Sequence, residues 1–375
     1  MRFTLSSALL SSKLNQLSKV ISSKNSISIL SCFLFEINNG QLTLTASDNN
    51  NMMRYYIPLN DFDGNGSFCI SSKMILSAVK ELADQPVSFE VSNDYNIRLV
   101  YQNGSYRLIG QSAEDYPLLK NIEGPYTSAN ITEAALSRNI QRTIFAAAVN
   151  EEIRLVMSGL CFDLQEENLN IVASDGHKLV RNMIFNCKTE LPASFILPIK
   201  PASLLRNVLS TNDENTVAIR FDDKNAEFEF SDGILSCLLI EGTFPKYNKV
   251  IPTDNPNVLT IDRRAFLGAL RRVMPFANEN TELIKLRLSQ SNLELITEDV
   301  DFASSAQEDI VCDYNGVPMT IGFKGSALSD ILNNLSSDDV IIELGDPSRA
   351  GVIRPSEQPE NEDVLMLIMP MIVND

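Results

Sequence analysis

The stretch Leu42–Asp48 (LTLTASD) recurs in this chain of 375 residues as Leu169–Asp175 (LNIVASD) and, with less identity, as Leu293–Asp299 (LELITED). The first two copies start 127 residues apart, and the second and third start 124 apart. A stretch that recurs at a nearly fixed period is typical of one structural unit built several times. The sequence therefore predicts three copies of one fold.

A second marker recurs with the same spacing. A strand-like segment ending in lysine occurs as Ile70–Lys73, Leu197–Lys200 and Ile321–Lys324, again 127 and 124 residues apart. Turn-forming residues cluster near Gly124 and between Pro252 and Asn257. We therefore predict domains over residues 1–124, 125–251 and 252–375. Each domain also contains a bulky residue followed by proline, at Tyr116-Pro117, Phe244-Pro245 and Met369-Pro370.

Each predicted domain mixes two hydrophobic periods. Segments such as Phe33–Ile37 and Glu227–Phe230 alternate apolar and polar residues, as half-buried antiparallel strands do. Two helical patterns per domain lie between them, so we expect an α+β fold with two helices on one face of each sheet. The predicted helices cover residues 6–20 and 72–82, then 132–144 and 200–209, then 262–273 and 325–335.

Composition limits the class of protein. The six cysteines are scattered singly with no CxxC pair, and we expect buried thiols rather than a metal or redox centre. No apolar run is long enough for a membrane helix, and the first residues lack the features of a secretory signal, so we expect a cytoplasmic protein. The formal net charge of −17 argues at first against binding to nucleic acid.

The positive charge is concentrated in the predicted helices. With Lys24 and Lys324 at their ends, these segments carry fourteen basic and four acidic side chains, whereas the rest of the chain is strongly acidic. In residues 262–273, Arg264 and Arg271 lie opposite the apolar face that packs on the sheet. For any single helix, basic residues indicate only a solvated surface.

Taken together, equivalent helices that face the same way would form a positive surface on an acidic body. Such a surface suits a protein that surrounds duplex DNA and contacts its phosphates without reading bases. No zinc-finger spacing, helix-turn-helix pattern or RNA-binding aromatic motif is present. The residues predicted to face DNA are Lys24, Lys73, Arg138, Arg142, Lys200, Arg206, Arg264, Arg271 and Lys324.

Several segments resemble, in order and spacing, motifs of the bacterial sliding clamp family, the beta subunits of DNA polymerase III. They are Asn25–Ser31, Ala173–Leu179 (ASDGHKL), Phe244–Pro252 (FPKYNKVIP), Arg271–Val273 followed by Asn278-Glu279, Ile321–Lys324 and Ile368–Met371. The resemblance covers the whole chain. It implies three similar domains per subunit, with sheets outside and helices inside, and a head-to-tail homodimer that closes a six-domain ring.

The resemblance also implies two protein-binding surfaces. Partner proteins, including the polymerase and the clamp loader, would insert a short peptide containing Gln and Leu or Phe into an apolar pocket. Its matching positions are Met157, Ser174, Gly176, His177, Lys178, Leu179, Pro245, Lys249, Val250, Leu367, Met369, Pro370 and Met371. Without the resemblance, residues 365–371 would be expected to form a buried terminal strand. The matching dimer positions are Lys73, Tyr106 and Leu108, facing Pro275 and Phe276 of the partner.

The chain departs from the family pattern at four positions near the implied pocket. Lys178 and Lys249 stand where arginine is usual, and Ala327 stands where an aromatic residue is common. Ile372 stands where arginine often follows the Met-Pro-Met sequence. The rim chemistry and the peptide preference of typical members therefore do not carry over directly to this chain.

Two other functions are alternatives to a clamp. An enzyme would find its best centre at Ser174–His177, where the only histidine lies beside a serine and an aspartate. Neighbours in one turn point in divergent directions and cannot form a relay, and the sequence lacks nucleotide-binding, dinucleotide-binding and zinc-protease motifs, so we expect neither catalysis nor a cofactor. A repeat scaffold that binds only proteins is the remaining alternative.

Overall fold

The computed structural model describes residues 1–22, 27–149, 155–185, 187–189 and 191–373. Its contacts divide the chain into two compact units, one formed by residues 1–137 with 200–239 and the other by residues 138–199 with 240–375. Lys24, one of the residues predicted to face DNA, lies outside the described residues.

The first unit contains two antiparallel sheets. One has the strand order β5 (Asp61–Asp63), β1 (Arg2–Ser6), β7 (Pro86–Val91), β8 (Asn96–Tyr101) and β9 (Gly104–Ile109). The second sheet joins strands of the first domain to strands of the second through pairing of β17 with β4. Its order is β10 (Thr127–Thr132), β15 (Thr216–Phe221), β16 (Asn225–Phe230), β17 (Gly233–Leu238), β4 (Asn51–Pro58), β3 (Gln41–Ser47), β2 (Cys32–Asn38) and β6 (Gly66–Ser71).

The second unit repeats this construction, with β13 paired to β26 at the junction. The long sheet has the order β14 (Ala193–Pro198), β11 (Gly159–Leu164), β12 (Asn168–Ser174), β13 (Lys178–Phe185), β26 (Glu362–Ile368), β25 (Gly351–Pro355), β24 (Asp339–Leu344), β18 (Asn257–Asp262) and β22 (Asp313–Tyr314). The shorter sheet has the order β21 (Ser304–Val311), β20 (Asn292–Asp299), β19 (Leu283–Ser289) and β23 (Met319–Lys324).

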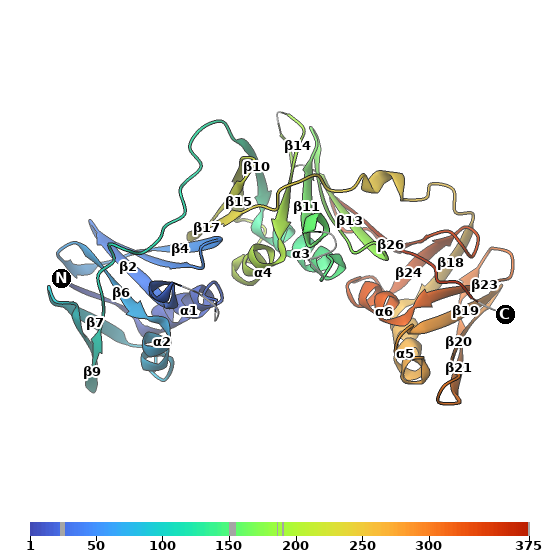
Figure 1. Cartoon of the computed structure of the whole chain (residues 1–375), viewed down its shortest axis with the longest axis horizontal. Helices are drawn as coiled ribbons and strands as arrows, with labels where there is room; N and C mark the ends of the chain where they lie inside the picture. Colours follow the sequence, from blue (N-terminus) through green and yellow to red (C-terminus); the bar gives the residue numbers. More distant parts are fainter. Residues whose placement is uncertain (23–26, 150–154, 186, 190, 374–375) are drawn as a thin grey trace. The chain divides into compact units, whose positions relative to one another are not determined.

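The helices lie within one or two residues of the predicted ranges. They are α1 (Ser7–Ser18) and α2 (Ser72–Lys80), α3 (Glu133–Thr143) and α4 (Ile199–Val208), and α5 (Arg263–Val273) and α6 (Gly325–Asn333). Figure 1 shows α1 beside α2 and α5 beside α6, each pair in contact. Five of the predicted ranges are slightly long and the one for α4 is shifted by one residue, because apolar periodicity does not mark where a helix begins or ends.

The strand order confirms the predicted repeat. The groups β6-β2-β3-β4, β14-β11-β12-β13 and β23-β19-β20-β21 have the same connectivity, and a helix follows β6, β14 and β23 in each case. The markers Lys73, Lys200 and Lys324 therefore occupy equivalent positions, at the junction of that strand and that helix. The chain is an α+β protein of three similar domains.

Candidate functional site: a cavity in the second unit

The turn between β12 and β13 forms one wall of a cavity. Gly176 has a φ of 91°, a left-handed conformation that glycine adopts without strain. The Oδ1 atom of Asp175 accepts hydrogen bonds from the amides of His177 at 2.8 Å and Lys178 at 2.9 Å. Asn49, at the equivalent place in the first domain, also has a positive φ of 78°. The turn is thus part of the repeated architecture.

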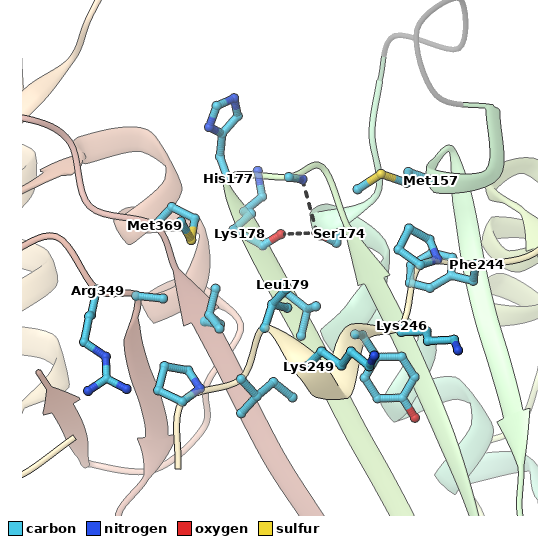
Figure 2. Close-up of a pocket in the computed structure, with 18 of the residues that line it drawn as sticks. Met157, Ser174, His177, Lys178, Leu179, Phe244, Lys246, Lys249, Arg349 and Met369 are labelled. Carbon is cyan, nitrogen blue, oxygen red and sulfur yellow. Dashed lines mark hydrogen bonds between the residues drawn. The ribbon is translucent and has the colours of Figure 1, made fainter. Parts of the chain in front are cut away.

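The side chains of this turn are not arranged for catalysis. The Ser174 hydroxyl donates to the Lys178 carbonyl at 2.9 Å and accepts from the Gly176 amide at 3.1 Å. Figure 2 shows the imidazole of His177 pointing away from Ser174. A serine that donates to a carbonyl, with no base beside it, cannot act as an activated nucleophile. The expectation that Ser174–His177 is a turn agrees with this geometry.

The cavity has a volume of about 640 Å³ and lies wholly within the second unit. Its walls come from the β12–β13 turn, the end of β26 and the segment Phe244–Lys249, here called the strap (Figure 2). Phe244 and Tyr247 of the strap are buried with Leu179 and Leu367 in one apolar cluster. Because these two rings hold the strap in place, Pro245, Lys246 and Lys249 remain exposed on its surface.

The structure brings most of the predicted pocket residues together. Met157, Ser174, Gly176, His177, Lys178, Leu179, Pro245, Lys249, Val250, Leu367 and Met369 all line the cavity. Pro370 and Met371 do not, and the Met371 amide instead donates to the Gly322 carbonyl at 2.8 Å. The chain therefore turns away from the cavity after Met369, which is 41% exposed.

Further lining residues were missed from the sequence. Phe244, Lys246 and Tyr247 belong to the quoted motif Phe244–Pro252 and could have been included on that signal. Arg349 and Ala350 precede β25, and no sequence pattern indicates that this loop reaches the cavity.

Two of the cations at the cavity are paired with acids. The Lys178 ammonium lies 2.8 Å from Asp175 and 3.8 Å from Asp330, and Arg349 binds Asp254 at 2.6 Å. Burial raises the pKa of Asp175, but hydrogen bonds from Lys178 and His177 outweigh it, so the pKa lies below its usual value. The pKa of Asp330 is raised, chiefly by burial. Lys178 lowers it by attraction, and the negative charges of Asp175 and Glu282 raise it further.

Two further departures from the family pattern are the apolar residues Ala327 and Ile372. Ala327 is buried in α6. Ile372 is exposed. Neither residue lines the cavity.

The predicted DNA-facing residues differ in their exposure. Lys73, Arg138, Arg264, Arg271 and Lys324 are exposed, and Phe266, Leu270 and Val273 bury the opposite face of α5 as predicted. Arg206 is half-buried in α4. Lys200 is held by the Asp48 carboxylate and by the Val20 carbonyl at 2.6 Å. Its charge is therefore neutralised within the protein.

The structure contradicts the prediction that Arg142 faces DNA. Its guanidinium forms an ion pair with Glu362, and its side chain is only 13% exposed. The Glu362 side chain is 2% exposed, so the pair lies inside the second unit. A helix that is basic overall can place one arginine on its buried side when a distant strand supplies the carboxylate, and the helical pattern alone does not reveal it.

The predicted dimer residues lie on edges or short helical turns. Tyr106 and Leu108 belong to β9, the edge strand of its sheet, while Pro275 and Phe276 belong to the turn Met274–Phe276. Phe276 is 43% exposed, but Leu108 is only 8% exposed in the single chain. Lys73 is exposed at the start of α2.

The described residues contain no group of three or more His, Cys, Asp or Glu side chains arranged to hold a metal ion. The cysteines are all unpaired, and burial raises the pKa of Cys161 to about 12. In the part of the chain that is described, no helix is long and apolar enough to cross a membrane.

The chain matches family models of all three domains of one protein. They are the N-terminal, central and C-terminal domains of the DNA polymerase III beta subunit, over residues 1–120, 130–246 and 248–372. A beta sliding clamp from Haemophilus influenzae is 28% identical over 98% of this chain and 99% of its own length.

Solved structures agree in fold. A sliding clamp from Bartonella birtlesii, bound to griselimycin, is 25% identical with a TM-score of 0.90 and full coverage of both chains. One from Pseudomonas aeruginosa, also bound to griselimycin, is 24% identical with a TM-score of 0.93 and full coverage of both chains. With its three repeated domains matched in order, this chain belongs to the DNA polymerase III beta subunit family of bacterial sliding clamps.

Proposed function

We propose that the chain acts as a DNA sliding clamp, a non-catalytic processivity factor that encircles duplex DNA and tethers a polymerase to it. The observation that carries the proposal is the threefold repeat of one α+β domain, matched over residues 1–120, 130–246 and 248–372 by the three domains of the family. We infer the domains 1–124, 125–251 and 252–375, and we place the protein in the cytoplasm.

The proposed DNA contact is electrostatic and independent of sequence. Lys73, Arg138, Arg264, Arg271 and Lys324 are exposed on helices or at their starts, and cations in such positions attract phosphate without reading bases. Since the chain as a whole carries a net charge of −17, tight nonspecific binding is not expected. Retention on DNA would then come from a closed ring, formed by two copies of the chain.

The proposed protein contact uses the cavity of about 640 Å³. Apolar walls from Leu179, Val250 and Leu367 suit an apolar peptide, and the unbranched side chains of Met157 and Met369 can adapt to different ligands. The griselimycin complex of the Bartonella birtlesii relative supports a ligand-binding role for the family fold. We propose that short peptides of the polymerase, the clamp loader and other DNA-processing proteins bind here.

Retention on circular DNA tests the function directly. The chain should be loaded onto a nicked circular plasmid by a bacterial clamp loader with ATP, and then separated from free protein by gel filtration. A clamp stays with the circle and is lost when a restriction enzyme linearises it, because a ring can slide off an end. Equal retention on circular and linear DNA would contradict a topological link. No retention on either, with peptide binding intact, would favour the scaffold that binds only proteins.

A further inference from the structure

A second cavity lies on the other side of the strap. It has a volume of about 310 Å³ and shares Phe244, Pro245, Lys246, Tyr247 and Lys249 with the first cavity. Its remaining walls are Cys161, Asp163, Ser194, Thr243 and Asn248, from the second domain alone. A peptide longer than the first cavity could therefore continue over the strap into the second cavity. The side chains there differ in chemistry from the apolar walls of the first.

The two lysines of the strap differ from the other cations of the first cavity. Among the residues that the structure describes, no carboxylate forms an ion pair with Lys246 or Lys249, whereas Lys178 and Arg349 in the same cavity are paired. Lys246 directly precedes the 3₁₀ turn Tyr247–Lys249, and Lys249 ends it. Because residues three apart lie on one side of such a turn, the two lysines are expected on the same side of the strap. Figure 2 shows both lysine side chains extending away from Arg349 and Met369.

The one carboxylate of the second cavity is already bound. Asp163 accepts a hydrogen bond from the Tyr247 hydroxyl at 2.6 Å and another from Gln165 at 2.6 Å. Burial and then the contact with Asp163 raise the pKa of Tyr247, so its phenol remains a donor. Ser194, Thr243 and Asn248 are exposed and can donate to an incoming group. The second cavity therefore offers donors and two unpaired cations to a ligand.

We propose that partner segments whose apolar residues occupy the first cavity carry an acidic stretch that crosses the strap and binds Lys246 and Lys249 at the second cavity. The inference rests on the proposed function of the first cavity. Two lysines would attract either an acidic peptide or DNA. A peptide is favoured here because the lysines are continuous with the apolar first cavity. The strap then selects among partners by their flanking charge, a role that the apolar walls cannot perform.

Labelled peptides with matched flanks test this selection. All share one five-residue core of Gln, Leu and Phe. Four peptides carry four Glu or four Gln residues at the N-terminal or the C-terminal end of this core, and the bare core is the reference. Fluorescence anisotropy should give a dissociation constant roughly three- to tenfold lower for one Glu-flanked peptide than for its Gln-flanked twin, as expected for two exposed ion pairs. The advantage should shrink as salt is raised from low to physiological concentration and above.

Variants locate the effect. The double variant Lys246→Gln, Lys249→Gln should lose the preference for Glu flanks, so that its dissociation constants for the Glu-flanked and Gln-flanked peptides become equal. The two peptides are compared on the same variant because both lysines also line the first cavity. Ser194→Tyr, which fills the second cavity from β14, should weaken the flanked peptide and spare the core. Lys120→Gln, at an exposed lysine that lines neither cavity, is the matched control and should keep the preference.

Three results would overturn the inference. A flank preference that is absent in a parent that binds the bare core, or that survives undiminished in the double variant, removes the strap site and leaves the proposed function intact. Loss of affinity for duplex DNA in the double variant, with peptide preference unchanged, would assign the lysines to DNA. Failure of the bare core to bind the parent would instead refute the first cavity, and the inference would fall with it.

Discussion

The Nδ2 atom of Asn139 in α3 donates to the Oε1 atom of Glu362 in β26 at 2.9 Å, inside the second unit. Glu362 also receives the Arg142 guanidinium, and Arg138 lies 3.6 Å away. One buried carboxylate thus ties the first helix of the second domain to a strand of the third. A buried charge is stable only while its partners remain, because desolvation is otherwise uncompensated.

Removing the Arg142 side chain should cost stability rather than DNA binding. Arg142→Ala leaves Glu362 buried without its main cation, and we expect a loss of about 3–5 kcal/mol in the free energy of unfolding. The salt dependence of DNA binding should stay unchanged. Urea unfolding and a DNA titration across a salt series measure the two effects.

Arg271 is the matched control for Arg142. Its guanidinium is exposed and donates to the Asn333 side chain at 3.0 Å. Arg271→Ala should leave the unfolding midpoint almost unchanged and lower the salt slope of DNA binding, because one phosphate contact is lost. The opposite result, a stable Arg142 variant with a reduced salt slope, would restore Arg142 to the DNA-facing surface.

The Met369 side chain should contribute to peptide binding, and Met371 should contribute less. Met369 lines the cavity, whereas Met371 is anchored by its backbone to Gly322. Met369→Ala should weaken a bound peptide by about 1–3 kcal/mol if it acts as a hot spot. Anisotropy titrations of Met369→Ala and Met371→Ala with one labelled peptide compare the two. Equal losses would show that a bound peptide reaches past the observed cavity.

The repeated topology could be predicted from the sequence because it is encoded locally. The markers Asp48 and Asp175 directly follow β3 and β12, Asp299 ends the equivalent strand β20, and the same spacing separates the lysines. Short-range patterns of this kind depend only on neighbours in the chain. The helix and strand types followed from them, as did the burial of one face of α5.

Long-range partners could not be predicted in the same way. Arg142 and Glu362 stand 220 residues apart, and nothing in the helical pattern marks one arginine as buried. The pairings of β17 with β4 and of β13 with β26 join edges of different domains. Such pairings depend on which edges meet after each domain has folded. Arg349 reaches the cavity through one of these joined sheets.

The Asp175 carboxylate should stabilise the β12–β13 turn over most of the pH range. Its pKa is lowered in the folded chain, so its contribution is present above the usual value of about 3.9 and is lost as pH falls through the lowered pKa. Asp175→Asn removes the bond from the Lys178 ammonium and should cost about 1 kcal/mol at neutral pH.

Urea midpoints of the parent and Asp175→Asn between pH 7 and pH 3 test this sign. The difference between them should remain constant down to about pH 4 and narrow below it, because the unfolded parent takes up a proton near the usual pKa of about 3.9, whereas the folded parent does so only at lower pH. A difference that grows as pH falls would mean that the folded chain prefers the protonated acid, in conflict with the three donors around Asp175.

An acidic residue at position 276 should separate the two copies of a dimer. If the first domain of one copy meets the third domain of the other, a twofold axis repeats the contact twice, and each substitution acts at both contacts. Phe276→Asp would bury an unpaired charge where an apolar ring packs, which is costly.

Leu191→Asp is the control, since Leu191 is also apolar, is exposed and lies outside the predicted interface. Analytical ultracentrifugation below micromolar concentration should show a dimer for the parent and the control and a monomer for Phe276→Asp. A Phe276→Asp variant that sediments as the parent does would place the dimer contact elsewhere on the third domain.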